Sequence, residues 1–411
     1  MKMKRHRFYA CLLTVMTLAG FTACSSTDND GVTDGQTVNG KSQLTLTINT
    51  PDISGSRAAI TSDPSDEKSI HRITVGIFDA SGNVRVIQEF LSGSGAAGTK
   101  TFSAADSHTL SVVTNKLAGG DRVLVAVNAP SGLFTGVQTA SAFQGKGVNA
   151  DRALATNFSS EGTVQSTPQS SNAPMYGESP LVAPASNGKP YTATVNVKHL
   201  TAKISLDDIE VAFDPKGSYS AATFSPTEIY VEHVNDGLNF NATAWKNVSQ
   251  VSGSSKSYLT TGAISGVKLS GAEKAATAKM SNKYYFYVTP SDKNVPSGTG
   301  ANAVRIWIKG QFDPDGDGGA AKATTVFYPV LVNATYNTNG TVSAANGAVY
   351  EVYPNKNYIC KVVIKTKGLP GGGPNGTDQP TAGNDELKPE TAAITVTVAN
   401  WDTYNQTTTF E

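Results

Sequence analysis

Residues 392–401 read AAITVTVANW and carry the pattern that decides the fold. Ile394, Val396 and Val398 alternate with two threonines, so an extended chain has one apolar face and one hydroxyl-lined face. Residues 367–390, which precede this strand, are rich in Gly and Pro and predict a flexible tether spanning about 25 Å. We therefore expect the strand, with Trp401 at its end, to lie outside its own sandwich and to fill a groove on a neighbouring molecule.

A second segment with the same alternation lies near the other end of the chain. Leu44, Leu46 and Ile48 form its apolar face, and a loop of small residues follows that contains Arg57 and Ala58. Such a loop can enter a protease as an extended chain, although a solvated surface arginine is the alternative interpretation. Two strands of one type, one tethered and one followed by a cleavage point, indicate that one replaces the other in a polymer subunit.

The first 23 residues have the order of a secretory signal, with a cationic start, an apolar run and small residues before Cys24. The sequence FTAC at 21–24 resembles a bacterial lipobox, in which the cysteine becomes the lipidated first residue; Leu is more usual where Phe21 stands. An ordinary signal peptide with an incidental cysteine is the alternative. The polar residues 25–43 predict a flexible spacer behind the lipid.

Size and composition favour a protein of many short strands. The chain has 411 residues, 39 of them Gly, and only 16% are charged, which allows two to three domains. It holds 33 basic and 33 acidic residues, and removal of the cationic signal leaves a small negative charge. No basic patch indicates nucleic-acid binding. Cys360 lies within a strand pattern and is interpreted as a small buried hydrophobe rather than a reactive thiol.

Strand patterns recur along the chain, and they predict an all-β protein of two β-sandwiches. We assign 1–23 to the signal, 24–57 to the spacer and removable strand, 58–194 to an N-terminal sandwich, 195–366 to a C-terminal sandwich and 367–411 to the tether and donor strand. The strand patterns cover residues 71–79, 84–90, 121–128, 191–206, 228–234, 284–288, 304–309, 325–332 and 358–365. Within residues 134–158 the spacing loosens towards helix, with 151–155 the best candidate.

One constellation could hold a metal ion. Asp313, Asp315 and Asp317 match the first half of an EF-hand calcium loop, with Gly at the sixth position. The bidentate Glu of the twelfth position is replaced by Thr324, and strand patterns flank the loop. A solvated hairpin turn is therefore the favoured interpretation and a weak calcium site the alternative.

No pattern of an enzyme is present in the sequence. The histidines show neither metal spacing nor a nucleophile partner, and nucleotide-binding glycine motifs are missing. Trp245 and Trp307 are expected to pack in a sandwich rather than to form a sugar platform. We predict a non-enzymatic protein that needs no cofactor.

Several short motifs in this order resemble the fimbrillin family, the type V pilins that are exported as outer-membrane lipoproteins. The motifs are ITVGIFD at 73–79, VAVNA at 125–129, VKHLTAKI at 197–204 and ITVTVANW at 394–401. The resemblance implies two transthyretin-like β-sandwich domains with a tethered C-terminal donor strand. It also implies that an arginine-specific surface protease removes the N-terminal strand, with Arg57 at the matching position, and that a strand from another subunit fills the vacated groove.

The leading hypothesis is therefore a shaft subunit of a surface pilus that polymerises by β-augmentation and supports adhesion. Its expected partners are other copies of itself, related pilins, the protease and, before processing, the outer membrane. A tip adhesin, a glycan-binding surface lipoprotein and an anchor subunit that keeps its lipid are the alternatives. A shaft subunit has to donate a strand, whereas a terminal subunit does not.

Overall fold

The computed structural model describes residues 42–400, with gaps at 51–68, 93–99, 103–107, 115, 150–172, 187–188, 236, 242–259, 271–278, 281–283, 291–303, 320–321, 337–341, 345–350, 374–375 and 381–392. All of these residues belong to one compact unit, Gly35–Glu411. The fold is all-β, as predicted. No helix within the described ranges is long and apolar enough to cross a membrane.

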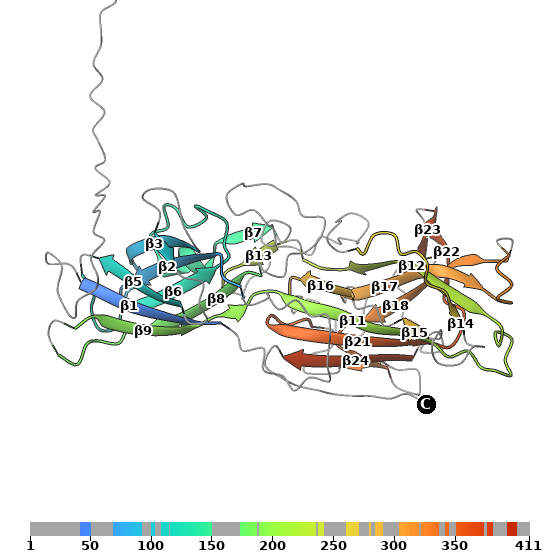
Figure 1. Cartoon of the computed structure of the whole chain (residues 1–411). Coiled ribbons are helices and arrows are strands. Elements are labelled where there is room, and N and C mark those ends of the chain that lie inside the picture. Colours follow the sequence, from blue (N-terminus) through green and yellow to red (C-terminus); the bar gives the residue numbers. More distant parts are fainter. Residues whose placement is uncertain are drawn as a thin grey trace, which may run out of the picture. The chain divides into compact units, whose positions relative to one another are not determined.

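The first sheet pair consists of a three-stranded and a six-stranded sheet (Figure 1). The smaller sheet has the order β5 (His108–Thr114), β1 (Ser42–Asn49), β9 (Tyr191–Asn196). The larger sheet has the order β10 (Lys198–His199), β8 (Met175–Pro180), β6 (Arg122–Val127), β2 (Arg72–Phe78), β3 (Val84–Ser92), β4 (Thr101–Phe102). One buried hydrophobic cluster joins the inner faces of the two sheets.

The burial of strand β6 on both faces explains why its sequence is continuously apolar. Val123, Val125 and Val127 point into the cluster shared by the two sheets, whereas Leu124 and Ala126 point to the opposite side. There they meet a second cluster, which includes Phe143 of the short helix α1 (Ala140–Gln144). Both faces of the strand are therefore buried, as predicted from its lack of alternation.

The second sheet pair consists of a five-stranded and a six-stranded sheet. One sheet has the order β15 (Lys279–Met280), β11 (Ala202–Val211), β21 (Lys356–Ile364), β24 (Ala393–Asn400), and β16 (Tyr284–Val288) also pairs with β11. The other has the order β14 (Leu269–Ser270), β12 (Thr223–Glu232), β17 (Arg305–Asp313), β18 (Thr324–Leu331), β22 (Leu369–Gly373), β23 (Gly376–Pro380). Their inner faces share the largest buried cluster of the chain's described part.

Two short ribbons complete the described structure. β7 (Gly147–Asn149) pairs with β13 (Gly237–Asn239), and β19 (Ala334–Tyr336) pairs with β20 (Val342–Ala344). The run at 191–206, predicted as one long strand, is divided into β9, β10 and the start of β11. The helix candidate at 151–155 lies outside the described residues, while α1 provides a helix within the predicted stretch 134–158.

Candidate assembly site around the first strand

Strand β1 is the central strand of its sheet. It runs antiparallel to β5, with Leu46 opposite Leu110, and parallel to β9, with Leu46 opposite Ala193. Figure 1 shows it lying between these two neighbours. A central strand satisfies backbone groups on both sides, so its removal would open two sheet edges at once.

The side chains of β1 divide between core and surface as the alternation predicts. Leu44, Leu46 and Ile48 are 0% exposed and belong to the core of the first sheet pair. Thr45 and Thr47 lie on the other face and are half-buried. Burial of each aliphatic side chain stabilises the fold by roughly 1.5–3 kcal/mol. The predicted strand and its apolar face are confirmed, while its removal remains a proposal.

The groove that holds β1 is lined by buried residues of β5 and β9 that were not predicted from the sequence. Leu110 and Val112 come from β5, and Ala193 and Val195 come from β9. Residues 108–114, HTLSVVT, do alternate, with Leu110 and Val112 buried and Thr109, like Ser111, exposed. This alternation could have predicted β5 as a strand, but no local sequence pattern predicts its pairing with β1.

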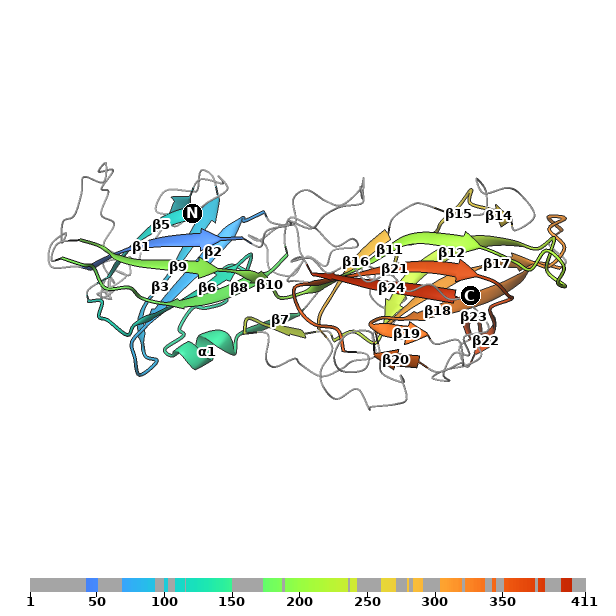
Figure 2. The ribbon, with the colours of Figure 1, turned by 90° about the horizontal axis from the view of Figure 1, so that it is seen from below.

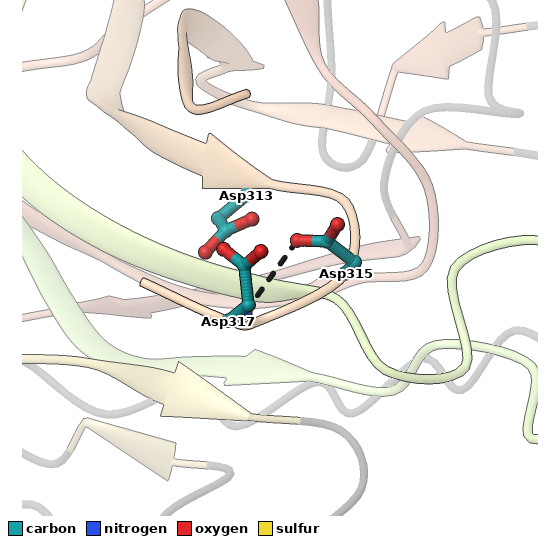
Figure 3. A group of neighbouring side chains, drawn as sticks. All are labelled: Asp313, Asp315 and Asp317. Carbon is teal, nitrogen blue, oxygen red and sulfur yellow. Dashed lines mark hydrogen bonds between the residues drawn. The ribbon is translucent and has the colours of Figure 1, made fainter. Parts of the chain in front are cut away.

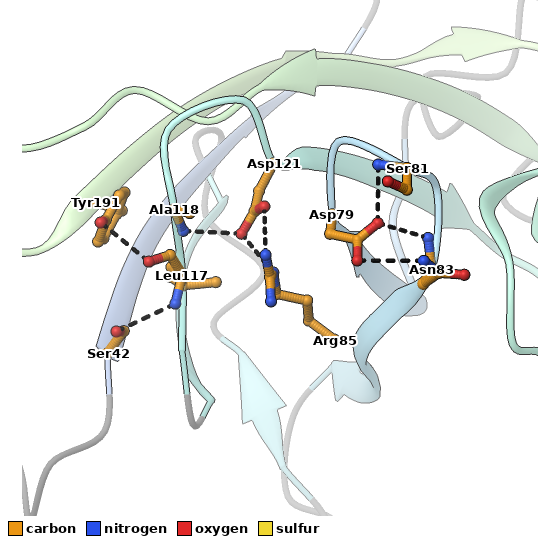
Figure 4. Close-up of polar contacts among 9 residues, drawn as sticks. All are labelled: Ser42, Asp79, Ser81, Asn83, Arg85, Leu117, Ala118, Asp121 and Tyr191. Carbon is orange, nitrogen blue, oxygen red and sulfur yellow. Dashed lines mark hydrogen bonds and ion pairs between the residues drawn. The ribbon is translucent and has the colours of Figure 1, made fainter.

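Polar contacts hold the beginning of β1 (Figure 4). The Leu117 N–H donates to Ser42 Oγ at 3.2 Å, and the Tyr191 hydroxyl of β9 donates to the Leu117 carbonyl at 3.1 Å. The turn that carries Leu117 is fixed by Asp121, whose Oδ2 accepts from the Ala118 N–H at 2.9 Å. These hydrogen bonds therefore connect the first residue of β1, through Leu117, to Tyr191 of β9.

A buried ion pair supports the same turn. Asp121 is 1% exposed and accepts two hydrogen bonds from Arg85 of β3, at 2.7 Å from Nε and 3.0 Å from Nη2. The hydrogen bond to Asp121 raises the pKa of Arg85, so the guanidinium stays charged. Bidentate pairs of this kind fix geometry as well as charge. The Asp79, Ser81 and Asn83 turn beside it in Figure 4 closes the β2–β3 hairpin independently of β1.

Two hydrogen bonds hold the far end of β1. Asn49 Nδ2 donates to Asn196 Oδ1 at 2.9 Å, and the Val197 N–H donates to the Asn49 carbonyl at 3.0 Å. The chain then enters residues 51–68, the only covalent connection from β1 to β2. Arg57 and Ala58 are in this segment and lie outside the described residues, as do Cys24 and Trp401.

The C-terminal strand differs from the expectation. β24 does not lie outside the sheets of its own chain, because it pairs antiparallel with β21 along its whole length (Figure 2). The register places Ile394, Val396 and Val398 opposite Val362, Cys360 and Tyr358, which are buried in the second core. The physical reason is that a strand with an apolar face can pair with an apolar sheet edge of its own chain.

The predicted tether is also shorter than expected. Its first part forms β22, which pairs with β18, and β23, which pairs with β22. The glycines permit a close approach, since a Cβ on Gly368 would lie 2.8 Å from the Phe327 carbonyl oxygen. Leu369 packs against the cluster of Tyr230, Trp307 and Phe327. Residues 381–392 lie outside the described residues.

The structure describes all of the remaining candidate residues except Trp245. Asp313, Asp315 and Asp317 lie together at the turn after β17. Trp307 is 1% exposed and packs in the β-sheet as predicted, whereas Trp245 lies outside the described residues. Cys360 is fully buried, which agrees with its interpretation as a core residue.

Comparison with known proteins identifies the fold. No protein-family model and no curated protein matches the chain. A fimbrilin from Porphyromonas gingivalis W83 aligns with a TM-score of 0.54 at 15% identity, over 88% of this chain and 99% of that one. A protein from Parabacteroides distasonis, provisionally described as a cell adhesion protein, gives 0.55 at 14% identity over 89% and 98%. A protein from Bacteroides eggerthii with the same description gives 0.52 at 19% identity over 89% and 98%. The chain therefore shares its fold with a fimbrilin and with two proteins that are provisionally described as cell adhesion proteins.

Proposed function

We propose that this chain is a non-enzymatic fimbrillin-like subunit of a surface fibre, and that it polymerises by exchanging β1 for a strand of another copy. The observation that carries the proposal is the position of β1. It is central in its sheet, its apolar face is wholly buried, and one segment, which contains Arg57, links it to β2. Cleavage after Arg57 would leave β1 attached by non-covalent contacts alone.

The energetics favour replacement of β1 over its free release. Three aliphatic side chains and two backbone ladders would be lost together, which is costly in water. An incoming strand of the same pattern restores both losses as it displaces β1 stepwise. The uncut subunit is therefore a closed monomer, and the cut subunit is one that accepts a strand.

The strand β24 is the proposed donor. Its sequence repeats the alternation of β1, and among the described strands it lies at the edge of its own sheet and pairs with β21 alone. The place of β1 offers two neighbours, β5 and β9. Transfer of β24 to another subunit therefore exchanges one backbone ladder for two, at the cost of an open edge on β21.

A second candidate is a terminal subunit, which accepts a strand without donating one. The pairing of β24 with β21 favours this candidate, because a strand that completes its own sheet need not leave it. The two candidates differ in one observable property: a shaft subunit polymerises with itself after cleavage, whereas a terminal subunit joins other pilins only.

Export as a lipoprotein to the outer membrane belongs to the same proposal. It rests on the signal-like start of the chain and on Cys24 in the lipobox-like sequence. Radiolabelled palmitate should enter the wild-type chain, whereas Cys24→Ala should remain unlabelled and fail to reach the surface. Surface delivery of an unlabelled Cys24→Ala chain would remove the lipid from the proposal.

The direct test uses purified, unlipidated protein and an arginine-specific protease. Cleaved wild-type protein should form fibres visible by electron microscopy, whereas Arg57→Lys should stay monomeric under the same treatment. Trypsin, which cuts after Lys as well as Arg, should restore fibre formation to Arg57→Lys and so control for folding. Cleaved chains that remain monomeric but bind a peptide of residues 392–411 would identify the terminal subunit. Cleaved chains that neither polymerise nor bind the peptide would contradict strand exchange.

A further inference from the structure

The turn that joins β17 to β18 gathers three carboxylates. Asp313 ends β17, and Asp315 and Asp317 follow at alternate positions. One oxygen of each lies within 4.8 Å of the others, and Figure 3 shows the three side chains directed toward a common point. Like charges repel at such distances, so positive charge close to the three carboxylates would stabilise the turn.

The backbone keeps these side chains on the inside of the turn. The Gly318 N–H donates to Asp313 Oδ2 at 2.9 Å, and Gly318 has a φ of +80°. Gly316 has a φ of +67° and lies so close to the preceding β11–β12 connection that a Cβ would be 2.3 Å from the Ala221 carbonyl oxygen. Both positions of the loop therefore favour glycine, which has no Cβ.

A buried carboxylate oxygen points to a ligand at this place. Asp313 is 6% exposed, and its Oδ1 is buried without a hydrogen-bond partner among the described residues. A buried charged oxygen without a partner is costly, because it has lost its water. Figure 3 places this carboxylate beside that of Asp317. A bound cation would satisfy this oxygen.

One lysine provides partial compensation. Lys322 Nζ contacts the Asp315 carboxylate and lies 3.4 Å from Asp317 Oδ2. The hydrogen bond from Lys322 lowers the pKa of Asp315, and the same bond raises the pKa of Lys322. The lysine side chain is 57% exposed, so it is free to move aside into water. Among the described residues, Lys322 forms the ion pairs with this cluster, and Lys268 Nζ lies 3.4 Å from the Gly316 carbonyl oxygen of the same turn. Two ammonium groups beside three carboxylates leave the turn negative.

We propose that Asp313, Asp315 and Asp317 bind a hard divalent cation, with calcium as the preferred ion and water completing its shell. Two oxygens on one calcium ion lie at most about 4.6–5.2 Å apart, which the cluster satisfies. Magnesium requires shorter bonds and near-octahedral geometry, so it binds less well. Because Thr324 stands where an EF-hand has its bidentate Glu, the affinity is that of an extracellular module, about 10⁻⁴–10⁻³ M.

Two measurements on the uncut, purified chain test this site. Calorimetric titration with calcium chloride should show one ion per chain, and calcium should raise the thermal midpoint relative to a chelator-treated sample. Asp315→Asn and Asp317→Asn should each weaken binding at least about tenfold, because each removes one of three charged ligands. Asp79→Asn is the matched control, a turn aspartate that also accepts backbone N–H groups but lies outside the cluster, and it should bind calcium as the wild type does.

Lys322→Gln separates a cation site from a structural ion-pair turn. If the ammonium competes with calcium, this variant binds calcium several-fold more tightly. Tighter binding with the losses at Asp315 and Asp317 supports the proposal. Absence of calcium binding at about 10 mM, unchanged binding in both Asn variants, or weaker binding in Lys322→Gln overturns it. Circular dichroism confirms that each variant is folded.

Discussion

Leu46 lies in the middle of β1 with no part of its side chain exposed. Leu46→Ala in the uncut chain should lower the free energy of unfolding by about 2–5 kcal/mol, because it leaves a cavity between the two sheets. Thr47→Ala, the neighbour on the half-exposed face, is the control and should cost less than about 1 kcal/mol. Urea denaturation measures both. Equal, small effects would mean that β1 is not part of the core.

His199 gives a prediction about acid. Burial lowers its pKa to about 3, and Lys203 adds to this effect. Between pH 6.5 and 3 the unfolded chain binds a proton that the folded chain does not, so stability falls as the pH falls. From pH 7 to pH 5 this residue alone should reduce the free energy of unfolding by about 2 kcal/mol. Urea titrations of His199→Gln at both pH values should show that much less pH dependence than the wild type; an identical dependence would contradict the assignment.

At the scale of elements, the pairing of β1 with β5 offers a reversible lock. Thr47 and Thr109 are opposite each other on the outer face of this antiparallel pair. Cysteines at both positions should form a disulfide and tie β1 to β5. After cleavage at Arg57, the oxidised double variant should remain monomeric, and a reductant should restore fibre formation. Fibres from the oxidised protein would show that β1 need not leave.

Strand β24 can be tested with a matched pair of charges. The register places Val396 opposite buried Cys360 and Thr395 opposite exposed Lys361. Val396→Asp should therefore destabilise the uncut chain by about 2 kcal/mol or more, whereas Thr395→Asp should be tolerated beside the lysine. Val396→Asp should also prevent polymerisation after cleavage. Thermal denaturation and electron microscopy measure the two effects, and normal fibres from Val396→Asp would exclude β24 as the donor.

Local patterns predicted most strands, but they could not predict which strands pair. The alternation in β1 identified its buried face, and the continuous apolar run of β6 identified a strand covered on both sides. The pairing of β1 with β9, which is distant in sequence, depends on the packing of the whole chain. The glycines and prolines at 367–390, with almost no apolar residues among them, predicted a tether. In the structure the first part of this stretch forms β22 and pairs with β18, where glycine permits a close approach.

The candidate sites show the same division. Leu44, Leu46 and Ile48 could be identified from sequence because burial follows the period of a strand. The groove residues of β5 and β9 could not, because their common position arises from tertiary structure. The Asp313–Asp317 turn was recognisable as a motif, but its missing twelfth ligand argued against a metal. The buried oxygen of Asp313 is visible only in three dimensions.

At the scale of the whole molecule, one chain contains both parts that the proposed strand exchange requires. The first sheet pair holds a central strand next to the proposed cleavage segment, and the second sheet pair holds an edge strand of the same alternating type. In the proposed function, assembly depends on one covalent event, the cut after Arg57. Before that event the proposed subunit would be complete by itself and would not polymerise during export.

The most direct measurement is mass spectrometry of fibres sheared from the cell surface. The chain in the fibres should begin at Ala58, and peptides that contain Leu44 to Ile48 should be absent, because another strand occupies their place. Cells that carry Arg57→Ala should release no such fibres. Fibres whose subunits retain Leu44 to Ile48, either in one piece or as a cleaved but bound segment, would contradict the exchange of β1.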